Sequence, residues 1–550
     1  MASSEYHHYQ YAHKETYESI TQKMKNKVVG FKDWQNFQKQ SAASDKHLFV
    51  QIPTGQGKTE ASLLWAVNGN NQQKILFLLP TMVTTNKMWK RMKTFFESDE
   101  IVGLSHGTAQ YVLKQEEQEL EDEQLRKHYL YNRTFFKPVT VATVDQLIYS
   151  FFNWGYWVLT GAASYNAKII IDEIHIYDAY TFGLLLKIME CIKPYHTQFA
   201  IMSASLPNIL KEEIEKIIPD YDLIHEKEFD DKQRHLIQVY DGVIEEKIAN
   251  IVEDYQNGKK VLVVCNTILK AREIFDSLQA IADDNKMLYH SQFILKDKKV
   301  KEDFLEKIKE LKTGFVAVCT QIVEVSLDID FDVLYTENAP IDAVIQRLGR
   351  VNRKGEIQLR FHDEKHAKVI ITKESEKSRK YVYKNLQKVL EVTFTKLKDY
   401  TTELHGCLRE KHFKQIVDEV YTKENVGAEY FKQIEEAKEL ITKLWQDFVK
   451  GIYTLSAEER KLQEISSRKI DYITVEAVLQ KHNLEFDFEQ LLIDKQYEFI
   501  KEYTLKVPIH VAKNKDYYIR RLNDSDIYLL YLEYDYQYGL SLKPDDQNMI

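Results

Sequence analysis

Cysteine is scarce in this sequence, and the few cysteines stand far apart. Only four of the 550 residues are cysteine, Cys191, Cys265, Cys319 and Cys407, and no two of them form a CxxC pair. Neither a zinc knuckle nor a disulfide framework is therefore indicated. We expect a cytoplasmic protein.

Long apolar segments are also missing. No run approaches the roughly 20 apolar residues that cross a bilayer, and the start, MASSEYHHYQYAHKETYES, lacks the apolar stretch of a secretory signal. With 44% hydrophobic and 29% charged residues, the composition is that of a globular protein rather than a disordered one. Because 550 residues are too many for one hydrophobic core, we expect two to four domains.

Positive charge is in short supply. The chain carries 75 Lys and Arg against 84 Asp and Glu, so its formal net charge is −9. A protein that binds phosphate backbones through its whole surface would usually be basic. Any nucleic-acid contact must therefore be a local basic track on an acidic body, which disfavours a passive binder and leaves room for an enzyme that holds a strand in a groove.

Short β-branched runs alternate with amphipathic segments of helical length between residues 48 and 372. Apolar runs of this kind, separated by helices, indicate strands covered on both faces and therefore parallel α/β sheets. The number of runs suits two such sheets. The runs are HLFVQIP, ILFLLP, VTVAT, KIIID, FAIMSAS, VLVVCN, FVAVCT, DVLYT and KVIIT.

The character of the sequence changes at two places. The charged stretch EKEFDDKQRH (226–235) separates two strand–helix series, and from about residue 373 helical patterns continue to about residue 500, before an aromatic, strand-like end. We therefore predict a tail at 1–30, parallel-sheet domains at 31–229 and 230–372, and a linker helix with an accessory C-terminal domain at 373–550.

The stretch IPTGQGKTE follows the first predicted strand and precedes a predicted helix. Gly55 and Gly57 let the backbone turn tightly, Lys58 can reach the β- and γ-phosphates of ATP, and Thr59 offers a hydroxyl to Mg²⁺. Ile52 stands where the strict phosphate-loop pattern has glycine, but the looser PTGxGKT pattern is common in nucleic-acid motors. The alternative is a glycine turn with an incidental GKT. The predicted ATP-binding residues here are Thr54, Gly55, Gln56, Gly57, Lys58, Thr59 and Glu60.

A second predicted strand runs into the acidic stretch KIIIDEIHIYDAY. In phosphate-loop ATPases such a strand ends in an acid that holds Mg²⁺, followed by an acid that activates water. We assign these roles to Asp172 and Glu173, with His175 as a coupling residue and Asp178 as a solvated helix start. Carboxylates and an imidazole suit several metals, so a metal nuclease is the competing hypothesis.

Three arginines recur every third residue in QRLGRVNRKG. Arg347, Arg350 and Arg353 therefore share one side of a helix-like turn. A guanidinium aimed at the γ-phosphate stabilises the charge of the transition state. Placed on a second sheet, such arginines reach the nucleotide only when two domains close; the alternative is a basic surface helix.

Further motifs follow in a fixed order: FKDWQ, LLPTMVTTNKMWKRMK, LSHGTA, TVATVDQL, MSASLP, VVCNT, YHSQF and TQIVEVSLDIDFD. With the three stretches above, they resemble superfamily 2 helicases, and within them the helicase of type I CRISPR interference systems, over roughly residues 30–360. The resemblance implies an α/β fold with two tandem RecA-like parallel-sheet domains, followed by a helical and β-containing C-terminal accessory region. Its implied cofactors are ATP and Mg²⁺.

The resemblance also assigns roles to single residues. It implies that Gln35 contacts adenine, Asp328 the ribose, and Gln346 the γ-phosphate. Ser205 replaces the usual threonine of the SAT-type linker, and Gln292 stands where this family often has arginine. Arg350 and Arg353 would be arginine fingers, while the coupling set comprises His175, Ser203, Ser205 and Arg347.

The same resemblance implies a track for single-stranded DNA, travelled in the 3′→5′ direction. Basic residues around a helix start bind phosphates without reading sequence. The candidates of this kind are Lys87, Lys90 and Arg91, and the contacts carried over from the family are Thr81, Thr143, Asp145, Gln146 and Thr320.

Members of this family often carry an N-terminal HD nuclease, whereas about thirty residues precede FKDWQ here. The only HD dipeptide, His362-Asp363 with His366 nearby, is best explained by chance. We expect a stand-alone helicase that unwinds target DNA for a separate HD nuclease subunit and is recruited by an RNA-guided, Cascade-like surveillance complex. A DExH RNA helicase and a duplex translocase without unwinding activity are the alternatives.

Overall fold

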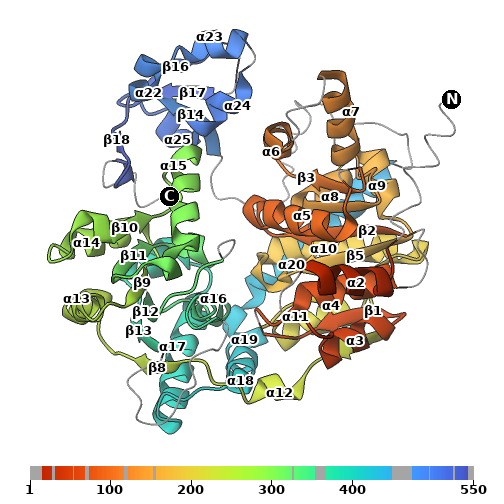
Figure 1. The fold of residues 1–550 in the computed structure, drawn as a ribbon, viewed down its shortest axis with the longest axis horizontal. Helices are drawn as coiled ribbons and strands as arrows, with labels where there is room; N and C mark the ends of the chain where they lie inside the picture. Colours follow the sequence, from red (N-terminus) through yellow and green to blue (C-terminus); the bar gives the residue numbers. More distant parts are fainter. Residues whose placement is uncertain are drawn as a thin grey trace. The chain divides into compact units, whose positions relative to one another are not determined.

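The computed structural model groups the chain into two compact units (Figure 1). The first comprises Met1–Lys232 with Val417–Lys469, and the second comprises Gln233–Ile416 with Ile470–Ile550. The chain thus passes from one unit to the other three times. The residues that the structure describes are 15–27, 31–53, 55–68, 73–98, 100–116, 122–152, 156–324, 328–353, 367–448, 474–494, 496–523, 525 and 527–542.

The first unit is built on a sheet of seven parallel strands in the order β3-β4-β2-β5-β6-β1-β7. Both faces of its central strands are buried, which is why those strands read as continuous apolar runs in the sequence. The strands are β1 His47–Val50, β2 Lys74–Leu79, β3 Val102–Ser105, β4 Val139–Thr143, β5 Ala167–Asp172, β6 Gln198–Met202 and β7 Tyr221–Ile224.

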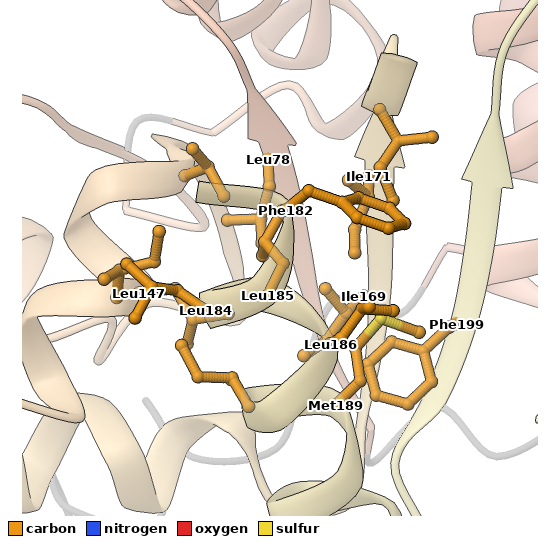
Figure 2. Close-up of a cluster of buried hydrophobic side chains, with 14 of the residues drawn as sticks. Leu78, Leu147, Ile169, Ile171, Phe182, Leu184, Leu185, Leu186, Met189 and Phe199 are labelled. Carbon is orange, nitrogen blue, oxygen red and sulfur yellow. The ribbon is translucent and has the colours of Figure 1, made fainter. Parts of the chain in front are cut away.

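Helices connect these strands and supply the two hydrophobic cores that cover the sheet. Alternate residues of β5 face opposite cores: Ile169 and Ile171 pack with Phe182 (Figure 2), whereas Ile170 packs with the cluster of Phe77. The helices are α2 Tyr17–Lys27, α3 Asn36–Ala43, α4 Lys58–Val67, α5 Met82–Phe96, α6 Ala109–Glu116, α7 Asp122–Arg133, α8 Val144–Ser150, α9 Trp157–Ser164, α10 Ala179–Ile192, α11 Asn208–Glu215 and α12 Lys227–Asp230.

A helix from the last third of the chain completes the first unit. The chain returns through α18 (Glu410–Val420) and α19 (Lys423–Val426) to α20 (Ala428–Phe448), which packs along α10. A Cβ atom on Gly183 of α10 would lie 2.5 Å from the Ile434 carbonyl oxygen, so the two helices approach this closely only because residue 183 is glycine. Ile434 and its neighbours on α20 are buried in the same core as Phe182.

The second unit contains six parallel strands in the order β10-β11-β9-β12-β13-β8. Its core is again built from β-branched residues, among them Val261, Val263, Val316 and Val318. Its strands are β8 Leu236–Val239, β9 Lys260–Val264, β10 Lys286–Tyr289, β11 Phe315–Cys319, β12 Val333–Glu337 and β13 Lys368–Thr372, and its helices are α13 Ile248–Gln256, α14 Ile268–Ser277, α15 Leu295–Glu306, α16 Ile341–Leu348 and α17 Gln387–Glu403.

The end of the chain forms a small mixed sheet in the order β15-β14-β17-β16 and a separate hairpin of β18 and β19. The hairpin belongs to the second unit, where Tyr534 of β18 donates a hydrogen bond from its hydroxyl to Asp297 of α15 at 2.5 Å. The elements are β14 Thr474–Leu479, α22 Gln480–Glu485, α23 Phe488–Ile493, α24 Tyr497–Glu502, β15 Leu505–Pro508, α25 Ile509–Ala512, β16 Tyr518–Arg521, β17 Ile527–Leu530, β18 Tyr534–Asp535 and β19 Gly539–Leu540.

The predicted fold class is confirmed, because all nine apolar runs are strands of two parallel sheets. The apolar runs did not predict four further strands, which are short or more polar: β3, β7, β8 and β10. The stretch 373–550, predicted as linker helix and accessory domain, is divided between both units, since residues up to 416 and from 470 belong to the second. Within the described residues, no helix is long and apolar enough to cross a membrane.

Candidate nucleotide site

The predicted phosphate loop joins β1 to α4, at the carboxyl end of the first sheet. Thr54 lies outside the described residues. Gly55 has φ of 81° and Gly57 has φ of 98°, values that L side chains rarely adopt. A Cβ atom on Gly57 would also lie 2.6 Å from Gln38 Nε2. The loop therefore needs glycine at both positions, as the sequence motif indicates.

A glutamine on α3 supports this loop, and the sequence analysis missed it. Gln38 Nε2 donates to the Gly57 carbonyl oxygen at 3.2 Å, and Gln38 Oε1 accepts from the Gln35 amide at 2.9 Å. Gln35 is exposed, and its Nε2 donates to the Gln56 carbonyl oxygen at 3.3 Å. The structure thus brings Gln35 to the loop, while its contact with adenine stays a prediction.

The buried Lys58 forms an ion pair with the half-buried Glu173. Lys58, at the start of α4, is only 8% exposed, and its Nζ lies 2.8 Å from Glu173 Oε1. Glu173 directly follows β5 and has φ of 48° and ψ of 49°, a left-handed conformation that costs free energy for a residue with a side chain. Strain of this kind is concentrated at functional sites. The predicted phosphate-binding lysine and the predicted base are therefore neighbours.

Asp172, the last residue of β5, carries an unsatisfied carboxylate oxygen. Its Oδ1 is buried and has no hydrogen-bond partner in the described part of the chain. Burial, followed by the nearby Glu173 carboxylate, raises the pKa of Asp172 to about 7, although the charge of Lys58 acts in the opposite direction. A carboxylate whose buried Oδ1 has no partner among the described residues, next to a threonine-bearing phosphate loop, fits Mg²⁺, which prefers oxygen ligands.

The predicted coupling residues of the first unit also meet. His175 Nδ1 lies 2.7 Å from Ser203 Oγ, and the same Oγ accepts from the Ser205 amide at 3.1 Å. Ser205 Oγ is buried and has no hydrogen-bond partner among the described residues. The contacts connect the end of β5 with the end of β6. Asp178 accepts from the Thr181 amide and begins α10, so it is the predicted helix start.

The three arginines of the second unit differ sharply in environment. Arg347 is fully buried, and its guanidinium donates to Glu324 Oε1, Thr336 Oγ1, the Glu337 carbonyl oxygen and Asn266 Oδ1, each at 2.8 or 2.9 Å. Its hydrogen bonds thus lie within the second unit. Burial raises the pKa of Glu324, while the charge of Arg347 acts against this shift.

Arg350 and Arg353 have different surroundings from Arg347. Arg350 is buried, and its guanidinium donates to the Glu324 carbonyl oxygen. Arg353 Nη1 lies 2.9 Å from Asp328 Oδ1, so two residues predicted to bind the nucleotide pair with each other in this structure. Gln346 is buried in α16. Their roles in hydrolysis stay predictions.

The predicted nucleic-acid contacts cluster at the carboxyl ends of strands. Thr81 follows β2 and caps α5, and Thr143 ends the neighbouring strand β4. Asp145 and Gln146, in the first turn of α8, are half-buried. Lys90 on α5 is exposed and Lys87 is half-buried, whereas Thr143, and Thr320 at the end of β11, are buried.

Gln292 lies beneath the terminal hairpin. Its carbonyl oxygen accepts from the Leu540 amide at 3.0 Å, and a Cβ atom on Gly539 would lie 2.7 Å from that oxygen. Arg272 donates to the Tyr538 carbonyl oxygen at 2.9 Å and also to that of Leu540. The position where the family often has arginine is therefore covered by the hairpin of β18 and β19.

Comparison with known proteins agrees with these features. Residues 35–212 match the DEAD/DEAH box helicase family, and residues 257–356 match the C-terminal part of the CRISPR-associated nuclease/helicase Cas3 family. A protein of Methanocaldococcus jannaschii that bears the Cas3 name is 32% identical over 507 residues, covering 87% of this chain and 65% of that protein. The CRISPR-associated nuclease/helicase Cas3 of Methanothermobacter thermautotrophicus is 26% identical over 486 residues, covering 86% and 54%.

Solved structures show the same fold. T. fusca Cas3 in its AMPPNP form superposes with a TM-score of 0.73 at 14% identity, covering 95% of this chain and 72% of that one. A chain of a CRISPR RNA-guided surveillance complex superposes with a TM-score of 0.59 at 14% identity, covering 90% and 68%. Two RecA-like sheets followed by a helical and β-containing region are therefore confirmed. The resemblance to superfamily 2 helicases and the CRISPR-associated helicase is confirmed as well, for a chain that spans 65% and 54% of the two relatives' lengths.

Proposed function

We propose that this chain is an ATP-driven helicase of a type I CRISPR interference system that moves on single-stranded DNA. The observation that carries the proposal is the ion pair of the buried Lys58 with the half-buried Glu173 beside Asp172, whose Oδ1 has no hydrogen-bond partner among the described residues. A lysine, a base and a free carboxylate oxygen next to a glycine loop are the groups that phosphoryl transfer to water requires.

The residues of the first unit would have separate roles in ATP hydrolysis. The loop amides and the start of α4 hold the phosphates, and Lys58 exchanges the Glu173 carboxylate for a phosphate oxygen. Glu173, released from this pair, orients and deprotonates the attacking water. Thr59 and Asp172 would hold Mg²⁺, which neutralises phosphate charge when bound.

Residues of the second unit would stabilise the transition state. We assign Arg350 and Arg353 to the charge that develops on the γ-phosphate, Gln346 to its detection, and Asp328 to the ribose. Support comes from the QRLGR resemblance and from the fixed placement of Arg350, which the Glu324 carbonyl oxygen holds.

Strand movement would use the carboxyl ends of the parallel strands. Thr81 follows β2 and Thr143 ends the neighbouring strand β4, an arrangement suited to successive backbone contacts on one strand of DNA. The contact between His175 and Ser203 would couple ATP binding and hydrolysis to the DNA contacts at Thr81 and Thr143. The 3′→5′ direction, a Cascade-like recruiting complex and a separate HD nuclease subunit are part of the proposal, and they rest on the resemblance to the Cas3 relatives.

Lys58→Ala tests the ATP site directly. We expect a loss of about 10²–10³-fold in ATP hydrolysis, since a preorganised positive group is removed from the phosphates. Lys46→Ala is the matched control, because Lys46 lies directly before β1, is exposed, and its Nζ lies 2.7 Å from Oδ1 of the exposed Asp220. Full ATPase activity in the Lys58 variant would contradict the assignment.

Substrate choice is tested with single-stranded DNA and RNA of equal length and sequence. We expect ATP hydrolysis to rise with DNA and much less with RNA. Stimulation by RNA alone would favour the RNA-helicase alternative, and stimulation only by duplex, without strand release, would favour the translocase. DNA cleavage with Mn²⁺ that is lost in Asp172→Ala but kept in Lys58→Ala would revive the nuclease hypothesis.

A further inference from the structure

Arg91, predicted as a phosphate contact, forms an ion pair with a buried acid of the ATP site. The residue lies on α5, the helix of the predicted nucleic-acid track, and its guanidinium donates to Glu60 Oε1. The side chain of Glu60 is 9% exposed and that of Arg91 is 46% exposed. The acid is therefore the enclosed partner, and the arginine covers it from the solvent side.

Glu60 belongs to the first turn of α4, directly after the phosphate-loop residues Lys58 and Thr59. Its Oε2 lies 3.5 Å from the point where a Cβ atom on Gly57 would stand. The carboxylate is thus packed under the loop that is to hold the phosphates. An acid in a first helical turn is favourable for the helix dipole, but this alone does not explain its burial.

The burial makes the pair asymmetric. A buried carboxylate that loses its counter-charge is destabilised much more than a half-exposed guanidinium that loses its acid. Other acids lie close by, because the charge of Arg91 is among those that lower the pKa of Asp172, after the larger effects of burial, Glu173 and Lys58. Without Arg91, the carboxylates of Glu60, Asp172 and Glu173 would be balanced by one positive charge fewer.

We propose that Arg91 is a positioning residue of the ATP site, which acts through Glu60 and links the helix of the nucleic-acid track to the first turn after the phosphate loop. The inference rests on the proposed function. It adds a contact within the first unit through which bound single-stranded DNA can change the affinity for ATP. A displacement of α5 by a strand would pull on Glu60 and hence on the turn that carries Lys58 and Thr59.

The test compares Arg91→Gln, Glu60→Gln, the double variant and Arg91→Lys. KM and kcat for ATP are measured with and without single-stranded DNA, and DNA affinity is measured without nucleotide. We expect Arg91→Gln to raise KM for ATP about tenfold, the size of one lost charge-assisted contact, and to reduce the stimulation by DNA. Glu60→Gln should have a smaller effect, the double variant should resemble Glu60→Gln, and Arg91→Lys should recover most of the loss.

Lys90→Gln supplies the standard for a lost phosphate contact, because Lys90 is the exposed neighbour on the same helix. The inference is overturned if Arg91→Gln behaves like Lys90→Gln. In that case DNA affinity falls, the slope of log affinity against log salt concentration decreases by about one, and KM for ATP is unchanged. Additive effects of the two single variants would overturn it too.

The two failures can be told apart. Absence of ATP hydrolysis in the unaltered chain would contradict the proposed function. The same four variants are then titrated with a fluorescent ATP analogue, and affinity losses that are not additive between residues 60 and 91 support the inference. Additive losses, or none, overturn it.

Discussion

The Lys58–Glu173–Asp172 cluster of the first unit and the Arg347 cluster of the second differ in how their charges are satisfied. In the first, Lys58 and Glu173 pair beside Asp172, whose Oδ1 has no partner among the described residues. In the second, Arg347 is fully buried and places four donated hydrogen bonds on Glu324, Thr336, Glu337 and Asn266. The first arrangement retains capacity for a ligand, whereas the second is complete without one.

This contrast predicts opposite signs for the removal of a charge. A completed network loses stability when one member is removed, because the remaining groups stay buried without partners. An incomplete site gains stability, because repulsion and desolvation are relieved, and it loses activity. Four predictions sharpen or break the contrast.

Arg347→Gln should have the largest effect on stability. The buried Glu324 carboxylate would lose its counter-charge, so we expect the second unit to lose about 3–5 kcal/mol. The measurement is hydrogen exchange of the peptides that contain β9 and β12, at equal pH and salt. The control is Arg353→Gln, because Arg353 pairs with the exposed Asp328 and should contribute less than about 1 kcal/mol. Equal protection in both variants would break the contrast.

Asp172→Asn should raise the stability of the ligand-free protein while abolishing ATP hydrolysis. Since the pKa in the folded protein is about 7, above the ordinary 3.8, folding favours the protonated carboxyl, and stability is lost as the pH rises through 7. Asparagine cannot ionise, so we expect a gain of about 1–3 kcal/mol at pH 8.

Calorimetry at pH 8 and at pH 5, without Mg²⁺, checks this prediction. The gain should be present at pH 8 and shrink toward pH 5, where Asp172 is protonated in the folded protein. A lower unfolding temperature of the variant at pH 8 would show that the Asp172 carboxylate stabilises the folded protein through its partners, as Arg347 does, and would break the contrast.

Gly183→Ala tests whether the first unit is loosely packed in general or only at its nucleotide site. A Cβ atom would lie 2.5 Å from the backbone oxygen of Ile434, so α10 and α20 must separate, at a cost of about 1–3 kcal/mol. Gly161→Ala in α9 is the matched control, because a Cβ atom there meets no heavy atom within 4 Å. The control should gain up to about 1 kcal/mol. The free energy of unfolding of both variants is measured in urea. A loss in Gly183→Ala but not in Gly161→Ala would show that the first unit is tightly packed between α10 and α20.

His235 should make the second unit sensitive to acid. Burial, and then the charge of Arg234, lower the pKa of His235 to about 3, while its Nε2 lies 2.7 Å from the Val351 carbonyl oxygen. Below pH 6.5, His235 binds a proton in the unfolded chain but stays neutral in the folded chain. The free energy of unfolding therefore falls by at most about 1.4 kcal/mol for each pH unit.

His235→Gln should flatten this dependence, because a glutamine amide can donate to the Val351 oxygen without titrating. The measurement is the unfolding temperature between pH 7 and pH 5. An unchanged slope in the variant would assign the acid sensitivity to other groups.

The parts of the site that are local in sequence could be predicted, and the parts that depend on tertiary pairing could not. The glycines of the loop, the strand before Asp172 and the helix start at Asp178 follow from neighbouring residues. The proximity of Gln35 to the loop and the contact of His175 with Ser203 agree with the order of motifs in the resembling helicases.

The missed features join segments that no local pattern connects. Gln38 supports Gly57 from another helix, and Arg91 meets Glu60 over 31 positions of sequence. The resemblance assigns Arg347 to the coupling residues, apart from Arg350 and Arg353, but only the structure shows the partners that enclose it. The return of α20 to the first unit is of the same kind, because its amphipathic pattern shows that one face is buried but not against which helix.

This return has a consequence for shortened versions of the chain. The unit that contains the candidate nucleotide site is built from two separate stretches of the sequence, Met1–Lys232 and Val417–Lys469. A gene ended before residue 417 would not remove a detachable appendage. It would remove Ile434, Ala437 and Ile441 from the core that they share with α10 and expose the apolar face of α10 to water. A minimal soluble fragment would need residues 417–448 spliced onto the end of the first stretch.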